Sequence, residues 1–232
     1  MTLARSVPDT PGLFRLSVPV PAIDVVLFTV IHGELCVAFV VRDKPPRKGG
    51  LALPGGIVAR GHCLEVNCND ILERKAGLPG AAGVYKEQLG AFGDPGRDSR
   101  GHVLSVVFWA LVPESLLAPA IDKRRVHPVR YADLDATRVC FDHAELVRAA
   151  KARLDERLVT STIARHLLPR RFTLARLQAV YEAILGRRLD KRNFRKRIGS
   201  LGLVRATAAF DGSASRRPAR LYEMAATPPR RF

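Results

Sequence analysis

Residues 51–78, LALPGGIVARGHCLEVNCNDILERKAGL, contain the pattern that decides the fold of the first half of this chain. A short apolar run ends at Gly55 and Gly56, and adjacent glycines let a backbone turn and pass close to a neighbouring group. Between positions 64 and 76 the apolar residues recur at the spacing of a helix with one buried side. Gly77 stands where a glycine commonly ends a helix. The stretch therefore predicts a strand end, a glycine turn, a loop and one amphipathic helix.

This stretch resembles the Nudix box. In that pattern a glycine, five residues and Glu are followed by seven residues and then Arg-Glu-aliphatic-x-Glu-Glu-x-Gly-aliphatic. The glycine and aliphatic frame is present at Gly56, Leu72, Gly77 and Leu78. The resemblance implies a Nudix-like domain in which a mixed sheet lies between helices.

The charged positions of the box are replaced in this chain. His62 stands at the first Glu position and Asp70 at the Arg position. The metal-binding carboxylates are replaced by Ile71, Arg74 and Lys75, which share one helix face. In the family that face binds magnesium, which activates water and clamps a diphosphate, whereas cations would repel the metal. We therefore expect no metal site, no catalytic residue and no hydrolase activity. Arg74 and Lys75 are then either solvated cations or contacts to a bound phosphate.

The net charge of the chain is concentrated in its last third. The 232 residues carry a formal charge of +16. Residues 1–150 hold 18 Lys/Arg and 16 Asp/Glu, whereas residues 151–232 hold 20 Lys/Arg and only 6 Asp/Glu. A nearly neutral domain followed by a strongly basic one indicates that the second domain meets a polyanion.

Cysteine usage and hydropathy favour a protein of the cytoplasm. The four cysteines form no Cys-x-x-Cys pair and have no His cluster at zinc spacing, which indicates free thiols in a reducing compartment. The first 30 residues lack the pattern of a secretory signal, and no apolar run approaches the ~20 residues of a membrane span. We expect neither a membrane partner nor a cofactor.

Apolar and β-branched runs predict the strands of the first domain. A proline-rich arm over residues 1–21 precedes an apolar run at 23–30 and a second run at 34–41, and His32-Gly33 supplies a hairpin turn. Further strands are expected at 82–91 and 103–112, and a last strand region with a turn at 119–138. Asp142 and Glu145 have the spacing of a capping box that opens a helix through the 150s. Asp142 and His143 could also form a catalytic dyad, but capping and packing explain them better.

The loop at 92–101, followed by Val103-Leu104-Ser105-Val106-Val107-Phe108, resembles the corresponding stretch of Nudix proteins that handle ADP-ribose-like ligands. Arg97 and Arg100 offer guanidiniums suited to bidentate phosphate contact, although a purely structural loop is the alternative. The predicted effector-binding residues are Arg42, Arg47, Gly55, Gly56, Arg60, Arg74, Lys75, Arg97 and Arg100.

The basic domain has the pattern of a winged helix. A helix is expected from 163 to 168, a second after the cap Thr173, and a third after the cap Asp190. A hairpin follows, with strands at 203–206 and 216–222 and a turn at 211–213. In a winged helix the third helix is the recognition helix. The predicted DNA-binding residues are Lys191, Arg192, Asn193, Arg195, Lys196, Arg197, Arg216, Arg217 and Arg220. Among these, Arg192, Asn193 and Lys196 are expected to contact bases.

This domain order resembles the Nudix-related transcriptional regulators, best known as repressors of NAD biosynthesis genes. The segments FDHAE at 141–145, RRFTLARLQAVYEAILGRRLDKRNFRKRI at 170–198 and RRPARLYEM at 216–224 carry the resemblance. It implies an arm at 1–21, an effector domain at 22–154 and a DNA-binding domain at 155–232. It also implies a homodimer on a palindromic double-stranded operator, with an ADP-ribose-type nucleotide as the effector.

Two other functions remain open at this stage. One is an active Nudix hydrolase of ADP-ribose-like nucleoside diphosphates with a basic tail, which would need carboxylates at 71, 74 and 75. The other is a nucleotide sensor whose basic domain binds RNA. The wide major groove of DNA suits a recognition helix better than the narrow groove of A-form RNA.

Overall fold

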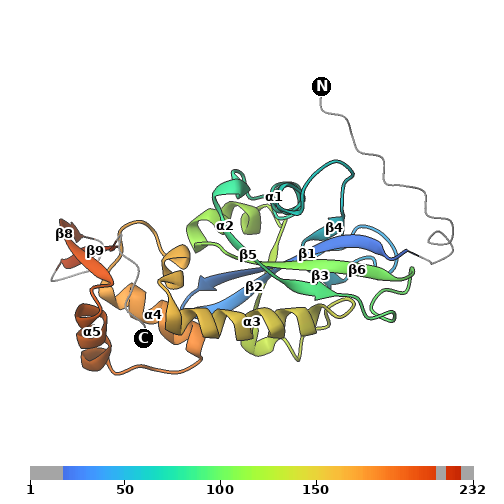
Figure 1. Ribbon diagram of the computed structural model, residues 1–232. Helices are drawn as coiled ribbons and strands as arrows, with labels where there is room; N and C mark the ends of the chain where they lie inside the picture. Colours follow the sequence, from blue (N-terminus) through green and yellow to red (C-terminus); the bar gives the residue numbers. More distant parts are fainter. Residues whose placement is uncertain (1–17, 213–217, 226–232) are drawn as a thin grey trace, which may run out of the picture.

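The computed structural model describes residues 18–212 and 218–225, and the first half of the chain forms one mixed sheet between helices (Figure 1). The strand order is β3-β2-β1-β6-β5, with β4 paired to β1 and β7 paired to β2. Only β1 and β6 run parallel among these pairs. The strands are β1 Val20–Ile31, β2 Glu34–Val41, β3 Leu51–Ala52, β4 Gly55–Ile57, β5 Tyr85–Phe92, β6 Val103–Leu111 and β7 His127–Arg130.

Strand β1 is central because its apolar side chains are buried on both faces of the sheet. Ile23, Val25 and Leu27 pack toward α1 (Leu64–Arg74) and α2 (Glu114–Asp122). The alternate side chains Val26 and Phe28 pack toward α3 (His143–Thr160). Figure 1 shows α1 and α2 on one face of the sheet and α3 along the other. The predicted layers, a mixed sheet between helices, are confirmed.

The local predictions around the box and the hairpin are confirmed. β1 and β2 join through His32 and Gly33, whose φ angles of 50° and 79° are typical of a hairpin turn. Helix α1 begins at Leu64 and ends at Arg74, and Gly77 follows in the left-handed region with φ 68°. β5 begins at Tyr85, after a short 3₁₀ turn at Ala81–Gly83, rather than at 82.

The prediction for residues 119–138 was partly wrong. The helix α2, Glu114–Asp122, was missed, because Pro119 lies inside it and the residue before it is Pro113. Proline is tolerated in the first turn of a helix but normally disrupts its interior. Here Leu117 and Ala120 are buried against the sheet, so packing outweighs local preference. The last strand of the sheet, β7, occupies only His127–Arg130.

The second half of the chain is a winged helix. A 3₁₀ turn, Ile163–Leu167, stands where the first helix was expected, and α4 Leu174–Leu185 and α5 Lys191–Ser200 follow. Thr173 and Asp190 cap these helices as predicted, accepting hydrogen bonds from the backbone N–H groups three residues later. The wing is β8 Val204–Asp211 paired with β9 Ala219–Met224. Part of the predicted turn and of the returning strand lies outside the described residues.

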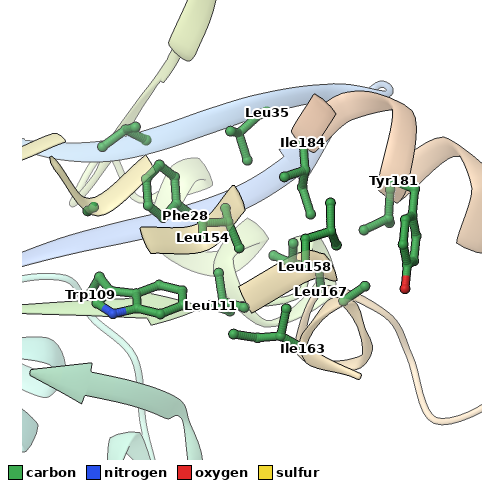
Figure 2. Close-up of a cluster of buried hydrophobic side chains, with 14 of the residues drawn as sticks. Phe28, Leu35, Trp109, Leu111, Leu154, Leu158, Ile163, Leu167, Tyr181 and Ile184 are labelled. Atoms are coloured by element: carbon green, nitrogen blue, oxygen red, sulfur yellow. The ribbon is translucent and has the colours of Figure 1, made fainter. Parts of the chain in front are cut away.

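One continuous hydrophobic core joins the two halves of the molecule. Helix α3 crosses position 155, and its buried Leu154 and Leu158 belong to the same core as residues of the sheet and of the winged helix. Figure 2 shows these leucines between Phe28 of β1 and Tyr181 and Ile184 of α4. The two halves are therefore packed together around α3. The domain boundary near residue 155 stays a prediction.

Candidate ligand pocket and DNA interface

A cavity of about 410 Å³ opens beside β1, β4 and the N-terminus of α3. Its volume lies within the range of small-molecule sites. Six of the nine residues predicted to bind an effector line it: Arg42, Gly55, Gly56, Lys75, Arg97 and Arg100. Arg47, Arg60 and Arg74 do not. The cavity therefore gathers residues from β2, the box and the loop after β5 into one cationic site.

The structure separates Lys75 from Arg74, although both replace carboxylates of the box. The Lys75 ammonium donates a hydrogen bond to the Gly55 carbonyl at the cavity wall. Burial lowers the pKa of this ammonium, and the carboxylate of Asp43 partly opposes that shift. The Arg74 side chain is 81% exposed, 3.8 Å from Asp70 on the same helix. Arg74 is therefore a solvated cation, whereas Lys75 lines the cavity.

Arg97 is held between two carboxylates at the cavity wall. Its Nε and Nη2 donate to the two carboxylate oxygens of Asp142 at 2.8 and 3.0 Å, and Nη2 also donates to Asp24 Oδ2 at 3.2 Å. Ser105 Oγ donates to the same Asp24 oxygen at 2.7 Å. Burial opposes the guanidinium charge, but the bonds to Asp142 and the charge of Asp24 leave the pKa of Arg97 raised. The guanidinium is thus already neutralised, which the sequence did not indicate.

The capping prediction for Asp142 was wrong in its chemistry. Asp142 does occupy the N-cap position of α3, but its side chain accepts no hydrogen bond from the helix. It binds Arg97 instead, because a bidentate charge-assisted pair is stronger than a cap worth about 1 kcal/mol. Packing does explain His143, whose Nδ1 accepts a hydrogen bond from the Leu53 N–H at 2.9 Å. Burial lowers the pKa of this imidazole.

Phe141 is a pocket residue that the sequence analysis did not single out. It has a φ of 57°, which is uncommon for a bulky side chain. The guanidinium carbons of Arg42, Arg47 and Arg100 lie 4.8, 5.8 and 5.9 Å from the centre of its ring. Arg125 and Lys44 also line the cavity without any local signal in the sequence. Phe141 belongs to the FDHAE segment, so the resemblance was the available indication.

Helix α5 presents a cationic surface. Phe194 and Ile198 are buried, and the other predicted residues of the helix are exposed: Lys191, Arg192, Asn193, Arg195, Lys196 and Arg197. At 3.6 residues per turn, Arg192 and Lys196 lie opposite the buried side. Asn193 and Arg197 instead flank an apolar groove of about 270 Å³ formed with Leu158 and α4.

On the wing, Arg220 is exposed and lies 5.6 Å from the ring of Phe210, whereas Arg216 and Arg217 lie outside the described residues. Three further cations escaped the sequence analysis. Arg170, Arg171 and Arg205 surround the carboxylate of Glu223, with nearest N–O distances of 3.9, 3.1 and 3.4 Å. Their positions before α4 and at the start of β8 make them additional candidates for phosphate contact.

Two general findings concern the described part of the chain. None of its helices is long and apolar enough to cross a membrane. Within it, no three His, Cys, Asp or Glu side chains are grouped so that they could hold a metal ion.

A Nudix-type sheet with a cationic cavity, packed through one helix onto a basic winged helix, defines the class of Nudix-related transcriptional regulators. Residues 164–224 match the family described as NrtR DNA-binding winged helix domain. An Acinetobacter baylyi protein named ADPR responsive transcriptional repressor NtrR is 33% identical over 215 residues, covering 89% of this chain and 82% of that protein. This chain therefore belongs to the NrtR family.

One solved structure resembles the whole chain and another resembles its Nudix half. Shewanella oneidensis NrtR complexed with a 27mer DNA has a TM-score of 0.77 and 31% identity, covering 88% of this chain and 93% of the other. The NUDIX domain of the same protein complexed with ADP ribose has a TM-score of 0.50 and 28% identity, covering 62% of this chain and 93% of that domain.

Proposed function

We propose that this regulator represses transcription by binding a palindromic operator as a homodimer, and that an ADP-ribose-type nucleotide in the cavity changes its affinity for the operator. The observation that carries the proposal is that α3 joins a cationic cavity to a basic recognition helix within one core. The A. baylyi relative is named as ADPR responsive, and the S. oneidensis relatives were solved with DNA and with ADP ribose.

The cavity has the chemistry that a nucleoside diphosphate requires. Arg42, Lys44, Lys75 and Arg125 place positive charge around it, and guanidiniums suit bidentate phosphate contact. Arg100 also lines the cavity, but its guanidinium is paired with Asp98 at 2.6 Å. Gly55 and Gly56 bring the backbone of β4 to the cavity wall.

Titration calorimetry with ADP-ribose, NAD, AMP and ribose 5-phosphate tests this assignment. We expect ADP-ribose to bind with a Kd well below about 1 mM. A Kd of about 1 mM corresponds to a binding free energy of about −4 kcal/mol. Arg42→Ala should weaken binding at least tenfold, whereas Arg74→Ala removes the same side chain outside the cavity and should leave binding unchanged. Equal effects of both variants would contradict the placement of the ligand.

Hydrolysis of the nucleotide is not expected. The helix face that would need carboxylates carries Ile71, Arg74 and Lys75, and the Lys75 ammonium already occupies the carbonyl of Gly55. The competing function is an active ADP-ribose hydrolase. Turnover of ADP-ribose in the presence of Mg²⁺ or Mn²⁺, abolished by a chelator, would favour that alternative over a pure sensor.

The winged helix is expected to read a specific duplex. Arg192 and Lys196, opposite the buried side of α5, are the strongest candidates for the major groove, and Arg220 on the wing for phosphate contact. Arg192→Ala should cost about 1–3 kcal/mol and relax one operator position. Arg220→Ala should weaken binding to all DNA sequences equally. It should also reduce by about one the slope of log affinity against log salt concentration.

Anisotropy titrations with operator DNA, scrambled DNA and an RNA duplex at several salt concentrations would measure both effects. The operator sequence would come from profiling the genomic sites that the protein binds, and we expect these near genes of NAD biosynthesis or related nucleotide metabolism. Equal affinity for all three nucleic acids would reduce the domain to a non-specific polyanion binder. For a dimer, half-sites should repeat about one helical turn apart, about 34–36 Å.

A further inference from the structure

The N-terminus of α3 forms part of the cavity wall. His143, the first residue of the helix, and Phe141, two residues before it, both line the cavity. The residue between them, Asp142, faces Arg97 and is not itself a lining residue. The start of α3 is therefore fixed by the same arginine that borders the ligand site.

The other end of α3 is fixed to the DNA-binding half. Leu154 and Leu158 are 0% and 1% exposed and share a core with Tyr181 and Ile184 of α4 (Figure 2). Phe194 of α5 belongs to the same core. An 18-residue helix is about 27 Å long, because each residue adds about 1.5 Å. The helix therefore connects Asp142 beside the cavity to the core shared with α4 and α5.

The Asp142 carboxylate is bound by Arg97 and not by its own helix. In this structure it accepts both hydrogen bonds from Arg97. The backbone N–H groups of Glu145 and Leu146, in the first turn of α3, donate to the Asp142 carbonyl rather than to its carboxylate. An anionic group bound in the cavity would compete for Arg97, which already serves two carboxylates, Asp24 and Asp142.

We propose that the Arg97–Asp142 pair couples ligand occupancy to DNA binding, with the ligand's phosphates drawing Arg97 from Asp142 and thereby shifting α3 and the winged helix. This inference rests on the proposed function, because it names the regulation of that same cavity. Asp142 is a positioning residue in this scheme. The Arg97 guanidinium, which binds either Asp142 or the ligand's phosphates, supplies the two-state element that coupling between distant sites requires.

The test measures the operator Kd of the full chain with and without saturating ADP-ribose, in the wild type and in Asp142→Asn. In the wild type we expect the two Kd values to differ by about 5- to 150-fold, the usual range of such coupling. In Asp142→Asn, with ligand occupancy verified by calorimetry, the ratio should fall to about threefold or less. The matched control is Asp155→Asn, which makes the same charge change on α3 at the pair with Lys151 and should keep the wild-type ratio.

The outcomes distinguish the two ideas. If ADP-ribose does not change the operator Kd of the wild type, the proposed function itself is refuted. A coupled wild type with an equally coupled Asp142→Asn would refute only the role of the pair. Hydrogen exchange on the wild-type protein provides a measurement that does not depend on a variant folding. ADP-ribose should change exchange in the first turn of α3 and also in α4, and a change confined to the strands of the cavity would overturn the inference.

Discussion

Alanine at Gly55 would clash with the central strand, whereas alanine at the adjacent Gly56 would not. A Cβ atom at position 55 would overlap Asp24 Oδ1 and stand 2.7 Å from the carbonyl oxygen of Ile23. At position 56 no atom comes nearer than 3.9 Å. The two residues are neighbours in β4 and both pair with β1, so they form a matched comparison.

The loss of stability in Gly55→Ala depends on which neighbouring groups must move to admit the new methyl group. β1 lies between β2, β4 and β6, so the Ile23 carbonyl is held by its neighbours and cannot withdraw. The Asp24 carboxylate would instead leave Ser105 and Arg97, which donate to it at 2.7 and 3.2 Å. Overpacking costs about 1–3 kcal/mol, and losing a hydrogen bond to a charged group costs about 1.5–3 kcal/mol. We expect Gly55→Ala to lower the free energy of unfolding by about 3–5 kcal/mol.

Urea denaturation measures this difference directly. Trp109 is the single tryptophan of the chain and is fully buried in the shared core, so its fluorescence reports unfolding. With the m-value unchanged, the shift of the midpoint gives the change in stability. Gly56→Ala should stay within about 0.5 kcal/mol of the wild type. If the two variants differed by less than about 1 kcal/mol, the packing of β4 against Asp24 would not be as described.

Three further changes test other parts of the molecule. Burial and the charge of Arg165 lower the pKa of His166 to about 4, whereas its pKa in the unfolded chain is near 6.5. The unfolded state therefore binds more protons, and the free energy of unfolding falls as the pH drops below about 6.5. His166→Gln should therefore remove part of the stability lost between pH 7 and pH 5, about 1 kcal/mol because solvent screens a partly exposed ring. An unchanged pH profile would contradict this. Leu154→Ala should lower the free energy of unfolding by about 2–5 kcal/mol. The unfolding transitions followed by fluorescence and by circular dichroism should stay coincident, and two separate transitions would show that the two halves do not share one core. Asp190→Ala should lower the free energy of unfolding by about 1 kcal/mol and weaken operator binding, because α5 loses its cap. Thermal unfolding and fluorescence anisotropy measure the two effects, and no change in either would contradict the capping role.

The local elements of this protein were determined by its sequence. Gly77 ends α1, His32 and Gly33 turn the hairpin, and Thr173 and Asp190 cap α4 and α5, as predicted. Each of these features depends on hydrogen bonds or backbone angles within a few residues. The basic charge of the last third and the altered box are likewise visible in the sequence, because they depend only on residue type and spacing.

The partners of the buried charges were decided by the tertiary structure. Arg97 and Asp142 are 45 residues apart, and only the closing of the sheet brings them together. Because that contact exists, a residue with the position of a helix cap instead binds a guanidinium. The same closure places Phe141 and Arg125 in the cavity and keeps α2 helical around Pro119. Long-range pairing of this kind depends on which strands become neighbours, and no spacing along the chain specifies it.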